Sequence, residues 1–120
     1  MFENDCLRSL YGASRANRIR MDEIRRALGI PSTIIDIVKK KRLKWYGHVV
    51  RKTNVSYVKK IYNNDFEGSR PRGRPPKKWK DQIRVDTNLP LLTVERMAKN
   101  RVKWKGSVEK FMRGSIGLCR

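Results

Sequence analysis

Residues 33–52 read TIIDIVKKKRLKWYGHVVRK, and this stretch indicates the fold class of the chain. Its large apolar residues, among them Ile34, Val38, Trp45 and Val49, are separated by four and seven positions, as on one face of an α-helix. No stretch of the chain alternates cleanly between apolar and polar residues over more than a few positions, so strands are not expected. The sequence therefore predicts an all-α fold.

Helical patterns also flank this stretch. RIRMDEIRRALGI, residues 18–30, places Met21, Ile24 and Leu28 on one face, and Gly29 follows as a residue suited to end a helix. The next helix is expected to begin near Ser32, its predicted N-cap. Three further segments show helical periodicity: 55–62, 76–86 and 93–112.

A turn-forming and basic segment, NNDFEGSRPRGRP, interrupts these patterns at residues 63–75. It predicts two small helical blocks joined by a basic, Pro/Gly-rich linker. The expected organisation is an N-terminal helical block, an AT-hook-like linker, a C-terminal helical block and a short tail, over 1–62, 63–75, 76–113 and 114–120.

The charge of the chain indicates its partners. Lys and Arg number 30 against 11 acidic residues among 120, a net charge of +19. Such a protein attracts polyanions, with nucleic acid the first candidate and an anionic membrane surface the second. No apolar run approaches the roughly 20 residues that span a bilayer, and the N-terminus lacks the features of a signal peptide. KKKR, residues 39–42, matches a nuclear import signal, so a nuclear protein is expected.

Residues suited to catalysis or metal binding do not cluster in the sequence. Cys6 and Cys119 stand at opposite ends with one histidine, His48, between them, which fits no zinc-finger spacing. His48 has no acidic neighbour in sequence to orient it, so we expect it to pack on its helix rather than act as a base. We therefore expect no enzyme activity, no cofactor and no metal site.

The helix expected over 33–52 carries the first candidate binding surface. Residues 39–60 contain nine Lys or Arg residues and no acidic residue, so this part of the chain could lie along phosphates and displace counterions. The alternative is a charged helix face that is merely solvated. The candidate residues are Lys39, Lys40, Lys41, Arg42, Lys44, Arg51 and Lys52.

The second candidate is the linker, whose layout is that of an AT-hook. A glycine lets the backbone approach the floor of the minor groove, prolines keep the chain extended, and flanking arginines enter a narrow A·T groove. The alternative is a stiff basic linker that any phosphate attracts. The candidate residues are Arg70, Arg72, Gly73, Arg74, Lys77 and Lys78.

Two weaker patterns also touch on nucleic-acid binding. Each of the three tryptophans follows a lysine, as in proteins that stack aromatic rings on bases, but their helical phase with aliphatic neighbours favours anchoring in the core. Residues 22–42 have a helix-turn-helix layout in which Ser32, Thr33 and Asp36 would face the bases. With Ile34 and Ile35 beside them, a structural helical hairpin is the preferred interpretation.

The order of these segments adds a resemblance. RIRMDEIRRALGI, RLKWYGHVVRK, GSRPRGRPPKKWKDQIRVD and MAKNRVKWK follow one another over residues 14–105. The arrangement resembles the C-terminal tail of non-LTR retrotransposon polyproteins, which follows the polymerase and thumb of these endonuclease–reverse transcriptases. The resemblance implies a fragment of a machinery for target-primed reverse transcription that handles element RNA and target DNA. The polymerase palm and the endonuclease are absent from this sequence, as is the Cys/His zinc knuckle of many family tails.

Three hypotheses follow. The first is a non-catalytic, electrostatically driven nucleic-acid-binding tail derived from such a reverse transcriptase; neutralising about six phosphates would give a salt slope of about −5. The second is an AT-hook-type minor-groove DNA-binding chromatin protein. The third is a structural module that packs on the reverse transcriptase domain of a parent polyprotein and gains helix only there.

Overall fold

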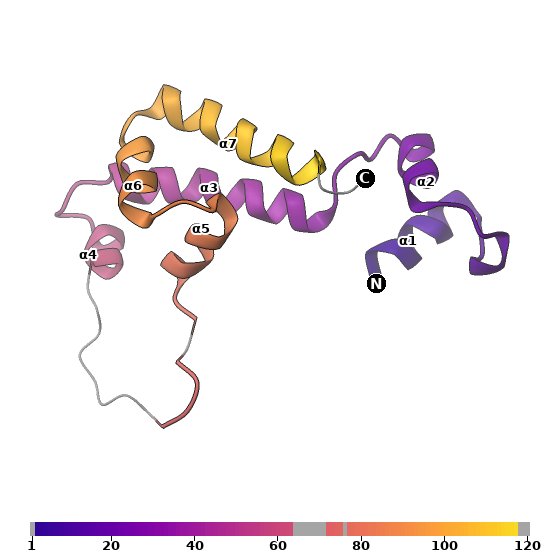
Figure 1. Cartoon of the computed structure of the whole chain (residues 1–120), viewed down its shortest axis with the longest axis horizontal. Helices are drawn as coiled ribbons and strands as arrows, with labels where there is room; N and C mark the ends of the chain where they lie inside the picture. The colour runs from indigo at the N-terminus through magenta and orange to yellow at the C-terminus, as the bar shows by residue number, and fades with distance from the viewer. Residues whose placement is uncertain (1, 64–71, 76, 118–120) are drawn as a thin grey trace. The chain divides into compact units, whose positions relative to one another are not determined.

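The computed structural model describes residues 2–63, 72–75 and 77–117 (Figure 1). These residues form helices and no strands, which confirms the all-α fold class. The elements in chain order are α1 (Phe2–Tyr11), the 3₁₀ helix η1 (Arg15–Asn17), α2 (Met21–Leu28), α3 (Ile34–Arg51), α4 (Tyr57–Asn63), α5 (Trp79–Thr87), α6 (Leu91–Lys99) and α7 (Arg101–Gly117).

The chain divides into two compact units, Met1–Ile37 and Val38–Arg120. This division differs from the one expected from the sequence, which ended the first block at residue 62. The reason is that Leu43 and Tyr46 of α3 share one core with Ile83 of α5 and Val94 of α6. Segments before and after 63–75 therefore pack together, and most of that expected linker lies outside the described residues.

The first unit packs α1 against α2. Leu7 of α1 and Ile24 of α2 are buried. Helix α1 was not predicted from the sequence. Gly29 ends α2 as predicted: its φ of +68° is in the left-handed region, and the Ile30 N–H bonds back to the Arg25 carbonyl at 2.9 Å.

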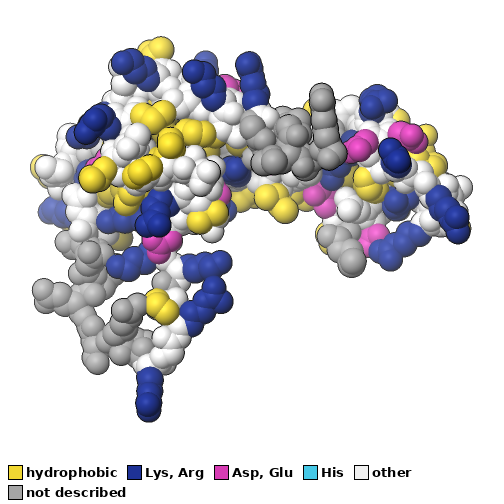
Figure 2. Space-filling view, viewed as in Figure 1, with side chains coloured by type: hydrophobic (Ala, Val, Ile, Leu, Met, Phe, Trp, Pro, Cys, Tyr) yellow, Lys and Arg dark blue, Asp and Glu magenta, His cyan; other side chains and the backbone are white. Residues whose placement is uncertain are grey.

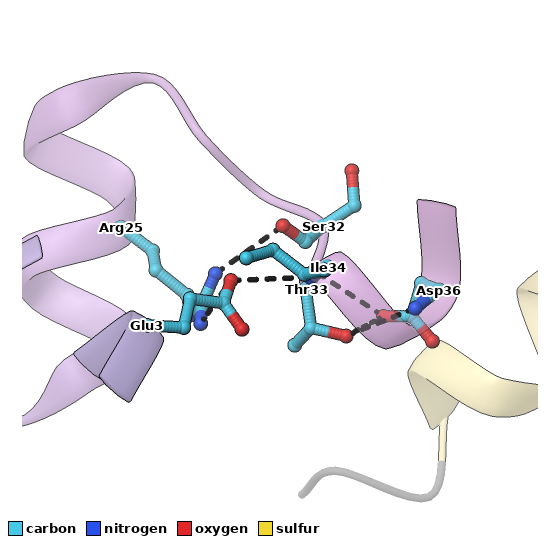
Figure 3. A network of polar contacts seen from close by, with 6 residues as sticks. All are labelled: Glu3, Arg25, Ser32, Thr33, Ile34 and Asp36. Carbon is cyan, nitrogen blue, oxygen red and sulfur yellow. Dashed lines mark hydrogen bonds and ion pairs between the residues drawn. The ribbon is translucent and has the colours of Figure 1, made fainter. Parts of the chain in front are cut away.

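A polar network joins α1 and α2 to the start of α3 (Figure 3). The Glu3 carboxylate accepts a hydrogen bond from the Ile34 N–H at 3.1 Å and forms an ion pair with Arg25 at 3.0 Å. The same guanidinium donates to the Ser32 carbonyl at 3.2 Å. Glu3 thereby satisfies one of the N–H groups that the first turn of a helix leaves unpaired.

The N-terminus of α3 is capped by Thr33 rather than by Ser32, the predicted N-cap. The Thr33 hydroxyl donates to the Asp36 carboxylate at 2.8 Å and accepts from the Asp36 N–H at 3.2 Å, a reciprocal cap (Figure 3). Two of the three residues that a helix-turn-helix would use on bases are thus occupied within the helix start. This observation counts against a base-contacting role for Thr33 and Asp36.

The second unit is built on α3, with α7 lying antiparallel alongside it (Figure 1). Lys40 and Glu109 form an ion pair at 3.0 Å, and the Trp104 indole N–H donates to the Leu43 carbonyl at 2.9 Å. The core between the helices consists of buried apolar side chains: Leu43, Tyr46, Val50, Ile83, Val94, Ala98, Trp104, Val108 and Met112.

The C-terminal helical segment is two helices, not the single one predicted over 93–112. Asn100 separates α6 from α7 with an extended backbone, φ −93° and ψ 112°. Its side-chain oxygen accepts hydrogen bonds from the N–H groups of Val102 and Lys103, both at 3.1 Å. Asn100 thus caps the start of α7, and the chain can turn so that α7 lies along α3.

An aromatic cluster joins α4, α5 and α7 to α3. The buried Tyr46 ring lies 6.1 Å from Tyr62, 5.8 Å from Trp79 and 5.9 Å from Trp104, centroid to centroid. The two tyrosine hydroxyls are 3.2 Å apart and share a hydrogen bond. Burial raises the pKa of both tyrosines, since the phenolate would lose its hydration.

None of the helices in the described part of the chain is long and apolar enough to cross a membrane.

Candidate nucleic-acid interface

Helix α3 has two faces with different roles. Leu43, Tyr46, Gly47 and Val50 are buried toward the other helices of the second unit. At about 100° per residue, Lys41, Trp45 and His48 lie on the opposite side of the helix, and Lys52 follows directly after its last residue, Arg51. These four residues, with Lys44 at the border, are all exposed. We call these five residues the outer face of α3.

Three of the predicted binding cations make contacts within the second unit. Arg42 pairs with Asp86 of α5 at 2.6 Å. Arg51 donates to the Ala98 carbonyl at the C-terminal end of α6 at 2.7 Å, where a cation is favoured by the helix dipole. Lys40 pairs with Glu109, and this contact holds the pKa of the Glu109 carboxyl below its usual range.

The remaining predicted cations of α3 differ in exposure. Lys41, Lys44 and Lys52 are exposed and Lys39 is half-buried. The first three therefore have side chains that a polyanion can reach in this unit. No acidic residue occurs anywhere in residues 39–60, although Glu109 of α7, which pairs with Lys40, also interacts electrostatically with Lys44.

One prediction about this face was wrong. Trp45 was expected in the core, but the residue is 55% exposed. His48, which was expected to pack on its helix, is exposed and lies beside Trp45 of the same helix. Their rings lie 6.3 Å apart, centroid to centroid. Helical phase shows which residues share a face of the helix, but it does not show which face packs against the core. In α3 the face that packs against the core contains Leu43, Tyr46 and Val50.

The AT-hook-like candidates are described in part. Arg72, Gly73 and Arg74 are exposed, as are Lys77 and Lys78, while Arg70 lies outside the described residues. Gly73 has a φ of +124°, a backbone conformation that only glycine adopts readily. The Lys78 N–H donates to the Asp81 carboxylate at 3.3 Å, so Lys78 marks the start of α5.

Further cations were missed in the sequence. Lys59 is buried and donates to the Val50 carbonyl at the end of α3 at 3.1 Å, which is a structural role.

Lys and Arg side chains stand out from the visible surface with few acidic side chains between them (Figure 2). The exposed cations of α6 and α7 contribute to this surface: Arg96, Lys99, Arg101, Lys103, Lys105, Lys110 and Arg113. The basic segment KNRVKWK, residues 99–105, contains several of these cations, so the sequence could have indicated a second basic surface.

Comparisons with known proteins identify no relative. No protein-family model, curated protein sequence or solved structure matches the chain. Among the residues that the structure describes, no three His, Cys, Asp or Glu side chains lie close enough together to hold a metal ion. The second unit is thus a helical scaffold with exposed lysines and an exposed indole on one side of α3.

Proposed function

We propose that this chain is a non-catalytic nucleic-acid-binding tail that acts in the nucleus. The observation that carries the proposal is the outer face of α3, where Lys41, Lys44 and Lys52 are exposed in a segment without acidic residues. Binding is largely electrostatic, because each lysine that neutralises a phosphate releases condensed counterions. DNA and RNA both carry the phosphates that such a surface attracts.

The origin of the tail is proposed from its sequence alone. The order of RLKWYGHVVRK, GSRPRGRPPKKWKDQIRVD and MAKNRVKWK resembles the C-terminal tail of non-LTR retrotransposon reverse transcriptases. On this proposal the partners are element RNA, target DNA and the reverse transcriptase domain of a parent polyprotein. The tail would supply affinity and position to that machinery rather than a chemical step.

The test is fluorescence anisotropy with labelled duplex DNA and structured RNA over a salt series. Replacing Lys41, Lys44 and Lys52 together by alanine is expected to weaken binding to all probes and to lower the salt slope by about 3. The control removes three exposed lysines of α6 and α7, namely Lys99, Lys103 and Lys105. Equal losses in the two variants would show that net charge, and not the outer face of α3, determines the affinity.

A second candidate is an AT-hook-type minor-groove DNA-binding protein. It is favoured by the exposure of Arg72 and Arg74 on either side of Gly73, whose positive φ provides a side-chain-free bend in the basic segment. This candidate predicts tighter binding to A·T-rich than to G·C-rich duplex. Replacing Arg72 and Arg74 by alanine would abolish that preference, whereas the α3 variant would retain it.

A further inference from the structure

Trp45 is set apart from the other tryptophans of the chain. Trp104 is buried and Trp79 is 37% exposed, and both contact the buried Tyr46 ring and so belong to the aromatic cluster. Trp45 projects from the opposite side of α3 and is 55% exposed, the most of the three. Its described ring contact is with His48, which is exposed too. A large apolar ring left in water at this position contributes little to the core and is available to a ligand.

Lysines bracket this ring along the helix. Lys41 lies one turn before Trp45, Lys44 is its neighbour in sequence, and Lys52 directly follows the end of the helix. From residue 41 to its last residue, Arg51, the helix rises about 15 Å, which matches four or five phosphates at about 3.4 Å per stacked nucleotide. The outer face of α3 therefore places one aromatic platform between cations at a spacing that suits a nucleic-acid strand.

We propose that Trp45 stacks on an unpaired base while Lys41, Lys44 and Lys52 hold the adjoining phosphates. This inference rests on the proposed function and specifies its ligand as single-stranded nucleic acid. Stacking on an indole requires an exposed base face, which a strand offers and a continuous duplex keeps within its own stack. The His48 ring borders the indole at an interplanar angle of 48°, so Trp45 alone supplies the stacking plane.

The chemistry of the face favours a strand over a protein partner. A protein that covered Trp45 with apolar side chains would also have to place acidic groups opposite three exposed lysines. A nucleic-acid strand supplies both features at every nucleotide, because each one carries a π-face and a negative charge.

The experiment compares three labelled probes of about 12 nucleotides per strand, within the range of known single-strand binding sites. They are an oligothymidine, an abasic strand of equal length and charge, and a duplex. Trp45→Ala in the full chain is expected to weaken binding of the oligothymidine about 5- to 50-fold, and to leave the other two probes within about two-fold. The salt slope should stay unchanged, since no charge is removed.

Two further variants make the result specific. Trp45→Phe keeps a ring and should recover part of the lost affinity for the oligothymidine. Val102→Ala removes apolar surface from another exposed residue of the second unit and should change nothing. Circular dichroism melts confirm that each variant folds, as expected for changes at exposed side chains.

The outcomes separate this inference from the proposed function. Wild-type binding that Trp45→Ala leaves unchanged, or weakens equally on all three probes, would overturn stacking and leave electrostatic binding intact. A wild-type chain that binds none of the probes would overturn the proposed function itself. Displacement of the strand by polyglutamate, with the same dependence on Trp45 for both ligands, would indicate an acidic protein partner and overturn the inference.

Discussion

At the scale of single residues, Gly47 is needed because of what lies over it. The Trp104 indole crosses α3 at this point and donates its N–H to the Leu43 carbonyl at 2.9 Å. A Cβ at position 47 would lie 2.5 Å from two atoms of that ring and 2.9 Å from the Arg51 guanidinium. Gly47 thus permits close packing of α7 on α3.

Gly47→Ala is therefore expected to destabilise the chain by about 1–3 kcal/mol, since the buried ring has to move. Helix propensity acting alone would predict the opposite, a gain of about 1 kcal/mol. Urea unfolding followed by tryptophan fluorescence measures the difference.

The matched control is Gly106→Ala in α7, where an added Cβ meets no atom within 4 Å. This change should stabilise the chain by up to about 1 kcal/mol. A stabilising effect at both glycines would contradict the packing described for Trp104.

At the scale of elements, the cations of α3 divide into two sets by the face on which they lie. Arg42 reaches α5, where its partner Asp86 also accepts a hydrogen bond from Gln82 at 3.1 Å. The Asp86 side chain is only 8% exposed. The neighbouring Lys41 points to the outer face and is exposed. Adjacent basic residues thus have different roles, one in stability and one in proposed binding.

Arg42→Ala is expected to lower the free energy of unfolding by about 2 kcal/mol, because it leaves the Asp86 carboxylate buried without its cation. Lys41→Ala should change stability by less than about 0.5 kcal/mol while weakening nucleic-acid binding. Urea titrations and anisotropy on both variants measure the two effects. If Arg42→Ala were as harmless as Lys41→Ala, the ion pair between α3 and α5 would not contribute to stability.

Most elements could be predicted from the sequence, since periodicity is a local property. The helix expected over 33–52 corresponds to α3. Gly29 ends α2, as predicted from its ability to adopt the left-handed conformation. The break at Asn100 was missed because the apolar positions keep helical phase across it. The helix breaks there because the Asn100 side chain caps the start of α7 and because α7 packs on α3.

At the scale of the whole molecule, the aromatic cluster is where four helices of the second unit meet. Tyr46 stands at its centre, and it shares a hydrogen bond with Tyr62 of α4. Burial is the main cause that raises the pKa of both phenols, so the folded chain keeps protons that the unfolded chain releases above pH about 10. Stability from this source is fully present below that pH and falls as the pH rises further.

The free energy of unfolding is thus expected to decrease between pH 10 and pH 11 or so, and to decrease less in Tyr46→Phe. At neutral pH, Tyr46→Phe should lower the free energy of unfolding by about 1 kcal/mol, because the hydrogen bond to Tyr62 is lost. Thermal unfolding by circular dichroism over this pH range tests both effects. Tyr57→Phe is the control, because Tyr57 is 82% exposed. Identical pH profiles for wild type and Tyr46→Phe would argue against a buried, protonated Tyr46.

The sequence by itself determined the helical class, the position of α3 and the positive charge, because helical period and composition are properties of the chain alone. Only the tertiary structure decided which cations form contacts within the second unit, which tryptophan lies outside the aromatic cluster and where the compact units divide. Arg42, Arg51 and Trp45 show the reason: periodicity assigns residues to a common face, but the partner of that face is supplied by residues 40 to 60 positions away. The binding site proposed on α3 is the side of the helix that does not pack against the other helices of the second unit.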